Sequence, residues 1–144
     1  PEWIVEATTQ KVDRPTKLAL VVDDALTART LHRGMLEAGG YVVHTATDAQ
    51  QALGRLQATA YDLVVCDVAM DGTDGIALTS LIRSNPATRS VPVVLVTAHE
   101  SDAVRERARA VGADAFLSKR ECRAGRLLVT AAEAVARRRA APVA

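Results

Sequence analysis

The chain has 144 residues, of which 49% are hydrophobic, 24% are charged and only 3% are aromatic, a composition typical of one soluble domain with an aliphatic core. Its net charge of +1 gives no reason to expect binding to nucleic acid or to a membrane surface. The sequence contains no apolar run of the roughly 18 residues that a transmembrane helix needs, its first residues do not resemble a signal peptide, and Cys66 and Cys122 are too few for a disulfide scaffold. We therefore expect a reduced, cytoplasmic protein with no membrane segment.

The chain begins with a polar segment, residues 1–16, which we interpret as a lead-in or linker. The main domain is predicted to span residues 17–139, followed by a tail at 140–144. Because the first residue is Pro rather than Met, we expect this domain to be a piece of a longer chain.

The first half of the domain alternates apolar runs with segments of helical spacing. Leu18–Val22 is a continuous apolar run, typical of a strand buried on both faces. The following helix, which Gly39 and Gly40 end, is marked by Ala28, Leu31, Met35 and Ala38. Tyr41–Thr45 is the second predicted strand, and Asp48 is placed to cap a helix. That helix is marked by Ala49, Leu53 and Leu56.

The second half continues the same alternation. Leu63–Cys66 is a third strand, which ends at Asp67. The next helix ends before Asn85-Pro86 and is marked by Leu78, Leu81 and Ile82. The last two strands are Val91–Val96 and Ala115–Leu117. The last two helices are marked by Val104, Ala108 and Val111, ending at Gly112, and by Leu127, Leu128, Ala131 and Val135.

Five strands that alternate with five helices predict an α/β fold. The strands are nearly continuous apolar runs, which favours a parallel, doubly wound sheet covered by helices on both faces. In such sheets the functional groups gather beyond the carboxyl ends of the strands.

The residues at those strand ends form the main functional signal. Four of the five strand ends bring acidic residues, a hydroxyl and an amine to one edge: Asp23 and Asp24 after the first strand, Asp67 after the third, Thr97 after the fourth and Lys119 after the fifth. Neighbouring carboxylates raise one another's pKa unless a cation stands between them, and Mg²⁺ prefers oxygen ligands of this kind. The pattern indicates a Mg²⁺-assisted phosphoryl site in which a carboxylate is the nucleophile.

The same residues resemble the response-regulator receiver family, the CheY-like domains, over about residues 17–139. The resemblance rests on Asp23-Asp24 after an apolar strand, on "CDVAMDGTDG" around Asp67, on "VLVTA" with Thr97 and on "ADAFLSK" with Lys119. It implies the flavodoxin-like strand order 2-1-3-4-5.

The resemblance also implies a role for each site residue. Asp67 matches the phosphoacceptor. Asp24 and Asp67 would bind Mg²⁺ directly, Asp23 chiefly through water, and the backbone carbonyl of Ala69 would be a further ligand. These roles imply a domain that takes a phosphoryl group from a histidine kinase, or from its phosphotransfer domain, and that is not an enzyme acting on an external substrate.

Further roles concern the switch and the loss of the phosphoryl group. Thr97 matches the switch hydroxyl and a phosphate-binding residue, Phe116 the switch aromatic, and Lys119 the phosphate-binding lysine. Ala69 and His99 match the positions that modulate hydrolysis in autodephosphorylation. The implied partner surface is made by the fourth helix, fifth strand and fifth helix, which is also a possible homodimer face.

The sequence departs from the family pattern near the site. Arg120 follows Lys119, where the family usually has Pro after a cis bond; because a cis bond without Pro costs about 3 kcal/mol, we predict a trans Lys119–Arg120 bond. Asp71 replaces a common Pro and is expected to face solvent.

Several questions stay open at this level. A Mg²⁺-dependent phosphohydrolase with an aspartyl nucleophile, and a receiver-like module that binds without phosphorylation, are alternatives; taken alone, the acidic pair Asp23-Asp24 could also cap the first helix. The segment "KRECRAGRLL" is similar to the C-terminal receivers of CheA-like hybrid histidine kinases, which favours intramolecular kinase domains as partners, with a stand-alone CheY-like regulator as the alternative.

Several single residues have plain structural interpretations. His32 and His44 share no metal spacing and are expected on the surface or a helix face. Cys66 is expected to be buried, and Arg137–Arg139 are expected to complement the helix dipole.

Overall fold

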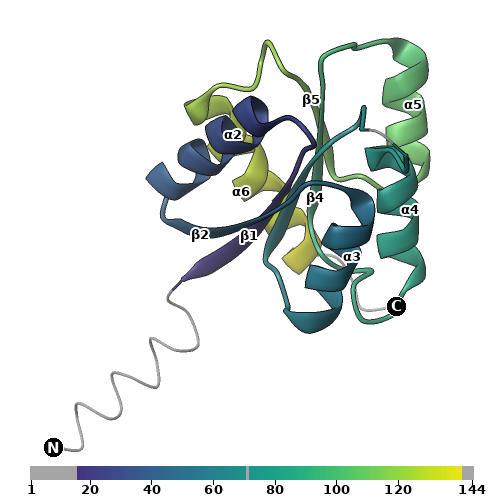
Figure 1. The fold of residues 1–144 in the computed structure, drawn as a ribbon, viewed down its shortest axis with the longest axis horizontal. Helices are drawn as coiled ribbons and strands as arrows, with labels where there is room; N and C mark the ends of the chain where they lie inside the picture. Colours follow the sequence, from purple (N-terminus) through teal and green to yellow (C-terminus); the bar gives the residue numbers. More distant parts are fainter. Residues whose placement is uncertain (1–15, 71, 141–144) are drawn as a thin grey trace, which may run out of the picture.

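The computed structural model describes residues 16–70 and 72–140 (Figure 1). Its strands are β1 (Lys17–Val22), β2 (Tyr41–Ala46), β3 (Leu63–Asp67), β4 (Val93–Thr97) and β5 (Ala115–Ser118). Its helices are α2 (Leu26–Ala38), α3 (Ala49–Ala58), α4 (Gly75–Ser84), α5 (Asp102–Ala110) and α6 (Ala124–Ala140). The predicted alternation of five strands with five helices is confirmed for the described ranges. The predictions for Asp71, for residues 1–15 and for residues 141–144 lie outside the described residues.

All strands run parallel in one sheet with the order β2-β1-β3-β4-β5. The register places the ends of neighbouring strands side by side: Val22, the last residue of β1, lies opposite Cys66, one residue before the end of β3, and the last residues of β4 and β5, Thr97 and Ser118, lie opposite each other. The carboxyl ends of these strands therefore form one edge. The predicted doubly wound, flavodoxin-like arrangement is confirmed, and the chain reverses its direction of winding at β1, next to β3.

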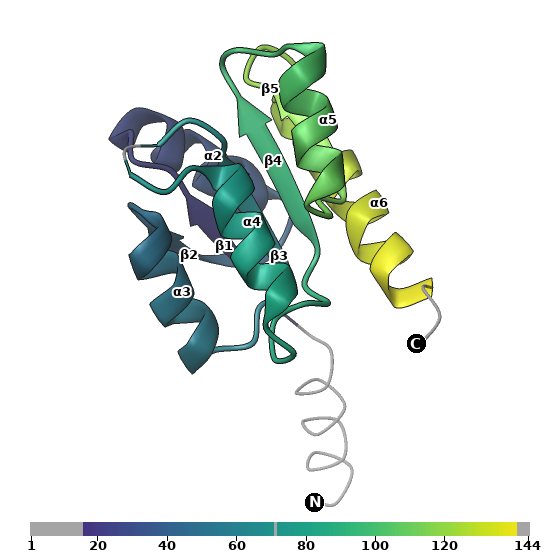
Figure 2. The ribbon, with the colours of Figure 1, turned by 90° about the vertical axis from the view of Figure 1, so that its right-hand side faces the viewer.

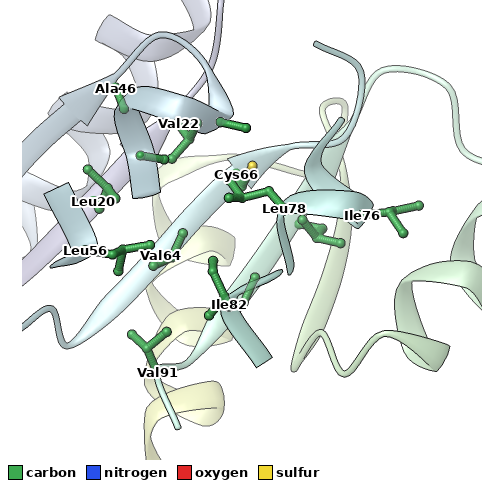
Figure 3. Packing of buried hydrophobic residues seen from close by; sticks show 14 of the residues in the cluster. Leu20, Val22, Ala46, Leu56, Val64, Cys66, Ile76, Leu78, Ile82 and Val91 are labelled. Atoms are coloured by element: carbon green, nitrogen blue, oxygen red, sulfur yellow. The ribbon is translucent and has the colours of Figure 1, made fainter. Parts of the chain in front are cut away.

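Helices cover both faces of the sheet. Figure 1 shows α2 and α6 on one face and α3, α4 and α5 on the other. Successive residues of β1 point to opposite faces: Leu20 and Val22 belong to the cluster under α3 and α4, and Ala19 and Val21 to the cluster under α2 and α6. The first cluster is drawn in Figure 3, where Leu78 and Ile82 of α4 lie close to the sheet. Both faces are packed with aliphatic side chains, as the low aromatic content predicts.

Side-chain oxygens cap the starts of α3 and α4. Asp48 accepts a hydrogen bond of 2.7 Å from the backbone N–H of Gln51 at the start of α3, which confirms the predicted cap. Asp74 does the same for the Ala77 N–H of α4 at 2.8 Å. These caps set where the helices begin relative to the strands before them.

Some details of the predicted elements are wrong. Strand β4 begins at Val93 instead of Val91. Leu31 and Leu81, used to mark helices, are 53% and 47% exposed. The buried face of α2 contains His32 and Leu36, four residues apart, so Leu31 is turned toward solvent. His32, expected on the surface or a helix face, lies on the buried face of α2 and is 3% exposed.

A network of ion pairs closes the other end of the sheet, where the strands begin. Asp114, just before β5, pairs with Arg83 of α4 at 2.9 Å and with Arg138 of α6 at 2.7 Å, and it accepts the backbone N–H of Val93 at 2.8 Å. Arg137 donates to the backbone carbonyl of Asp114 at 2.9 Å. Arg137 and Arg138 lie in the last turn of α6, as expected, and also bind the loop before β5.

Cys66 and Cys122 are both buried and free, and Cys66 fills a strand position in the first cluster, as predicted. Among the described residues, every helix is too short or too polar to span a bilayer.

Candidate functional site

The carboxyl edge of the sheet gathers the predicted side chains. Asp23 follows β1, Asp67 and Thr97 end β3 and β4, and Lys119 follows β5. The backbone N–H of Lys119 donates to the carbonyl of Thr97 at 2.7 Å, which ties the end of β5 to that of β4. Because the strands are parallel and in register, residues far apart in the sequence meet at one place.

Three carboxylates form the centre of the site. One oxygen each from Asp23, Asp24 and Asp67 lies within 4.8 Å of the others. Asp23 and Asp67 are 1% and 5% exposed, whereas Asp24 is exposed. Carboxylates this close repel one another strongly when all are ionised. A positive charge close to these carboxylates would therefore stabilise the site.

Asp23 is held in place by the loop that follows β1. Its Oδ1 accepts the backbone N–H of Ala25 at 2.9 Å, and its backbone carbonyl accepts a bond from Arg29 at 2.8 Å. Ala25, which has no side-chain cap bond, occupies the N-cap position of α2. Neither aspartate of the acidic pair therefore occupies the N-cap position itself.

Lys119 supplies one positive charge. Its Nζ lies 3.5 Å from Oδ2 of Asp23 and 3.6 Å from Oδ2 of Asp67. One ammonium contacts these two buried carboxylates, so the pair keeps an excess of one negative charge when both are ionised.

The pKa of Asp67 reflects both its burial and this excess of negative charge. Burial, followed by the charge of Asp23, raises the pKa of Asp67 from 3.8 to about 6, against the opposing effects of Lys119 and of the Ala69 backbone N–H, which hydrogen-bonds the carboxylate. The buried atoms Oδ2 of Asp23 and Oδ1 of Asp67 have no hydrogen-bond donor. Buried oxygens without donors are costly, and a hard divalent cation such as Mg²⁺ would satisfy them. The donor set therefore fits Mg²⁺.

The remaining predicted residues surround this centre. Thr97 is buried, and its Oγ1 accepts the backbone N–H of His99 at 3.1 Å. The residues Ala69 and His99 are exposed, beside Asp67 and just beyond β4 respectively. Phe116 is half-buried in β5, with the guanidinium carbon of Arg105 lying 4.9 Å from its ring centre.

The loop after β5 follows the sequence-based prediction. The described residues contain no cis peptide bond, so the Lys119–Arg120 bond is trans. The loop places Lys119 at the site without the proline that the family usually has.

Two residues near the site were missed. A Cβ on Gly75 would lie 2.2 Å from the backbone oxygen of Asp67, so α4 starts in direct contact with the strand end only because this residue is glycine. Its place in "DGTDG", shortly after Asp67, was the available signal. His32 is buried on α2, where burial lowers its pKa and the charge of Asp23 opposes that shift. No spacing in the sequence indicates that this histidine lies near Asp23.

Comparisons with known proteins identify the family to which the chain is similar. The sequence model of the response regulator receiver domain family matches residues 19–132. The chain is 35% identical over 102 residues to the gliding motility regulatory protein of Myxococcus xanthus, covering 71% of this chain and 13% of that protein. It is 39% identical over 101 residues to the transcriptional regulatory protein ZraR of Escherichia coli K12, covering 69% of this chain and 22% of that protein.

A solved structure shows the same architecture. The chemotaxis response regulator CheY4 of Vibrio cholerae matches with a TM-score of 0.76 and 28% identity, covering 83% of this chain and 98% of that one. The chain thus spans a small part of the two curated relatives but nearly all of a solved receiver.

Proposed function

The chain belongs to the response regulator receiver domain family, and we propose that it receives a phosphoryl group on Asp67 from the phosphohistidine of a kinase or of its phosphotransfer domain. One observation carries this proposal: Asp67 lies within a cluster of three carboxylates and beside Lys119 at the edge of the sheet where such sites form. In a two-component system, this transfer would pass the kinase signal to the domain.

The transfer would form one bond and break another. An oxygen of the Asp67 carboxylate attacks phosphorus, the bond between phosphorus and the histidine nitrogen breaks, and the electron pair stays on that nitrogen, which takes a proton from solvent. Lys119 stands close enough to Asp67 to offset charge on the phosphoryl oxygens. The hydroxyl of Thr97 is proposed to donate a hydrogen bond to one of them.

Mg²⁺ would be held by the side chains of Asp23, Asp24 and Asp67 and by the backbone carbonyl of Ala69. When bound, it would neutralise charge on the carboxylates and on the phosphoryl group. Asp24 and Asp67 are proposed as direct ligands and Asp23 as a partner acting chiefly through water. One oxygen of Asp23 accepts the Ala25 N–H, so only the other, Oδ2, is available to the ion or to its water.

The signal would leave through the face built from α5, β5 and α6, the fourth helix, fifth strand and fifth helix of the predicted fold. Thr97 and Phe116 are proposed to move together and so change what this face binds. The same face is the proposed homodimer surface. Autodephosphorylation would be modulated by the side chains at Ala69 and His99, which are exposed beside the site.

A chemotaxis-type setting is part of the proposal. A receiver joined to a CheA-like hybrid kinase would have kinase domains of its own chain as partners, and a stand-alone regulator would meet its kinase as a separate protein. Family membership argues against the phosphohydrolase alternative, and the complete set of Asp23, Asp24, Asp67, Thr97 and Lys119 argues against a module that binds without phosphorylation.

The test is phosphorylation by a small donor. The parent chain and Asp67→Asn are incubated with Mg²⁺ and acetyl phosphate, and their intact masses are measured. The parent should gain one phosphoryl group and Asp67→Asn none. Asp48→Asn, which replaces an exposed aspartate that caps α3, is the matched control and should be labelled like the parent. An unlabelled parent, or equal labelling of the parent and Asp67→Asn, would refute the proposal.

A further inference from the structure

A groove runs between α5 and α6 along β5, the edge strand of the sheet. Figure 2 shows these three elements together on one side of the molecule. The groove has a volume of about 280 Å³, and its charged lining consists of Arg105, Arg109, Arg137 and Asp114. Phe116 and three alanines supply the apolar part of its surface.

The charges in this groove do not balance. Asp114 is the only acidic side chain in the lining, and it is already paired with Arg83 and Arg138 from outside the groove. Arg137 donates to a backbone carbonyl, and no ion pair joins it to a carboxylate of the described residues. Arg109 meets Glu106 at 3.8 Å, with both side chains largely exposed, and such surface pairs contribute about 1 kcal/mol or less.

Arg105 is the third guanidinium and is occupied from within the chain. It lies over the ring of Phe116 and pairs with Glu100 in the loop between β4 and α5. Glu100 therefore occupies Arg105 in the way that a carboxylate of a partner would.

We propose that this groove is the docking site for an acidic segment of a partner protein. Carboxylates of the segment would pair with Arg109 and Arg137 and compete with Glu100 for Arg105, while an apolar side chain would rest near Phe116. The inference rests on the proposed function in taking this face as the one that reports the state of Asp67. The class of partner follows from the charges and shape of the groove.

The size of the groove favours a peptide over other anionic ligands. Its volume is at the lower end of the roughly 300–1,000 Å³ of small-molecule pockets, which suits one or two side chains of a longer segment. A nucleic acid would need a continuous basic surface or an open aromatic face. Here Asp102 and Glu106 interrupt the basic residues of α5, and Arg105 already covers one face of Phe116.

The test uses the full unphosphorylated chain without Mg²⁺ and two fluorescent peptides. One peptide alternates Glu with Leu, the other replaces each Glu by Gln, and binding is followed by fluorescence anisotropy. The parent should bind only the Glu peptide. Arg109→Glu and Arg137→Glu should each weaken binding about tenfold or more, because each replaces an attraction with a repulsion. Glu100→Gln should tighten binding a few-fold by freeing Arg105.

Arg33→Glu is the matched control. It makes the same charge change at an exposed position of α2, which packs beside β2 at the opposite edge of the sheet, and it should leave affinity within about twofold of the parent, since screening removes most long-range effects. An equal loss in Arg33→Glu and Arg109→Glu, or equal binding of both peptides, would overturn the proposal. So would tighter binding of a single-stranded oligonucleotide at the same groove.

Amide chemical shifts of the parent provide a measurement independent of the variants. Addition of the Glu peptide should perturb residues 105–116 and Arg137 most, and perturbation centred elsewhere would count against the groove. The docking proposal and the phosphorylation proposal can fail separately. Labelling of Asp67 without peptide binding rejects the acidic partner alone. Peptide binding without labelling of Asp67 rejects the phosphoryl proposal alone.

Discussion

Replacing Asp67 by Asn should make the metal-free protein more stable at neutral pH, and this gain should disappear in acid. The parent carboxyl is buried beside Asp23, so its pKa is raised from 3.8 to about 6 in the folded state. Asn has a similar shape and no charge to lose or gain. The variant therefore isolates the cost of holding this carboxylate ionised without a cation.

The magnitude follows from the two pKa values. The folded and unfolded pKa values differ by about two units, and each unit corresponds to about 1.4 kcal/mol. The free energy of unfolding of the parent therefore falls by at most about 3 kcal/mol as the pH rises from below 4 to above 6. The sign is set by the raised pKa: between these values the folded state binds more protons than the unfolded state, and stability falls with increasing pH. For a domain of this size, 3 kcal/mol corresponds to a shift of roughly 10 °C in Tm.

The assay is urea unfolding of the parent and Asp67→Asn at a series of pH values from 4 to 8, with chelator. The free energy of unfolding of Asp67→Asn should exceed that of the parent by up to about 3 kcal/mol at pH 8 and by little at pH 4. Added Mg²⁺ should narrow the difference at pH 8, because an ion that binds only the folded parent stabilises it. Asp48→Asn, which keeps a side chain able to cap α3, should show no comparable gain. If the free energy of unfolding of Asp67→Asn exceeds that of the parent by the same amount at pH 4 and at pH 8, the reasoning is refuted.

Three further predictions concern single residues of the site. Gly75→Ala should destabilise the protein by about 1–3 kcal/mol in urea unfolding, because its Cβ would meet the backbone oxygen of Asp67 at 2.2 Å; an unchanged midpoint would show that the helix start yields freely. Asp24→Ala should weaken Mg²⁺ binding, measured by calorimetry, more than Asp23→Ala does; equal affinity of Asp24→Ala and the parent would contradict the assignment of Asp24 as a direct ligand. Ala69→Asn should lose phosphate at least as fast as the parent in a phosphate-release time course, because an amide can orient the attacking water; slower release would count against this role for position 69.

The fold was accessible from sequence because its strands are apolar on both faces. Leu18–Val22 and Leu63–Cys66 can be interpreted without knowing their neighbours, and alternation with helices then limits the sheet to few arrangements. The site was accessible for a related reason: parallel strands bring their carboxyl ends to one edge, so Asp67 and Lys119 could be placed on the same edge from the predicted parallel sheet.

What the sequence did not reveal depends on contacts between distant positions. Leu31 was used to mark a helix, yet α2 buries His32 instead, because the packing of α2 on the sheet decides which face is covered. The pairing of Arg83 with Asp114, 31 positions later, has no local signature. Gly75 gave a signal, but only the position of the Asp67 carbonyl explains why a larger residue would not fit.

The Asp114 network has a mechanical consequence for any switch in this domain. It joins α4, the start of β4 and α6 at the end of the sheet opposite to Asp67, and breaking one partner of such a buried set costs about 3–5 kcal/mol. We therefore expect the surroundings of Asp114 to keep their contacts when residues near Thr97 move, so that any switch displaces the carboxyl edge of the sheet more than this end.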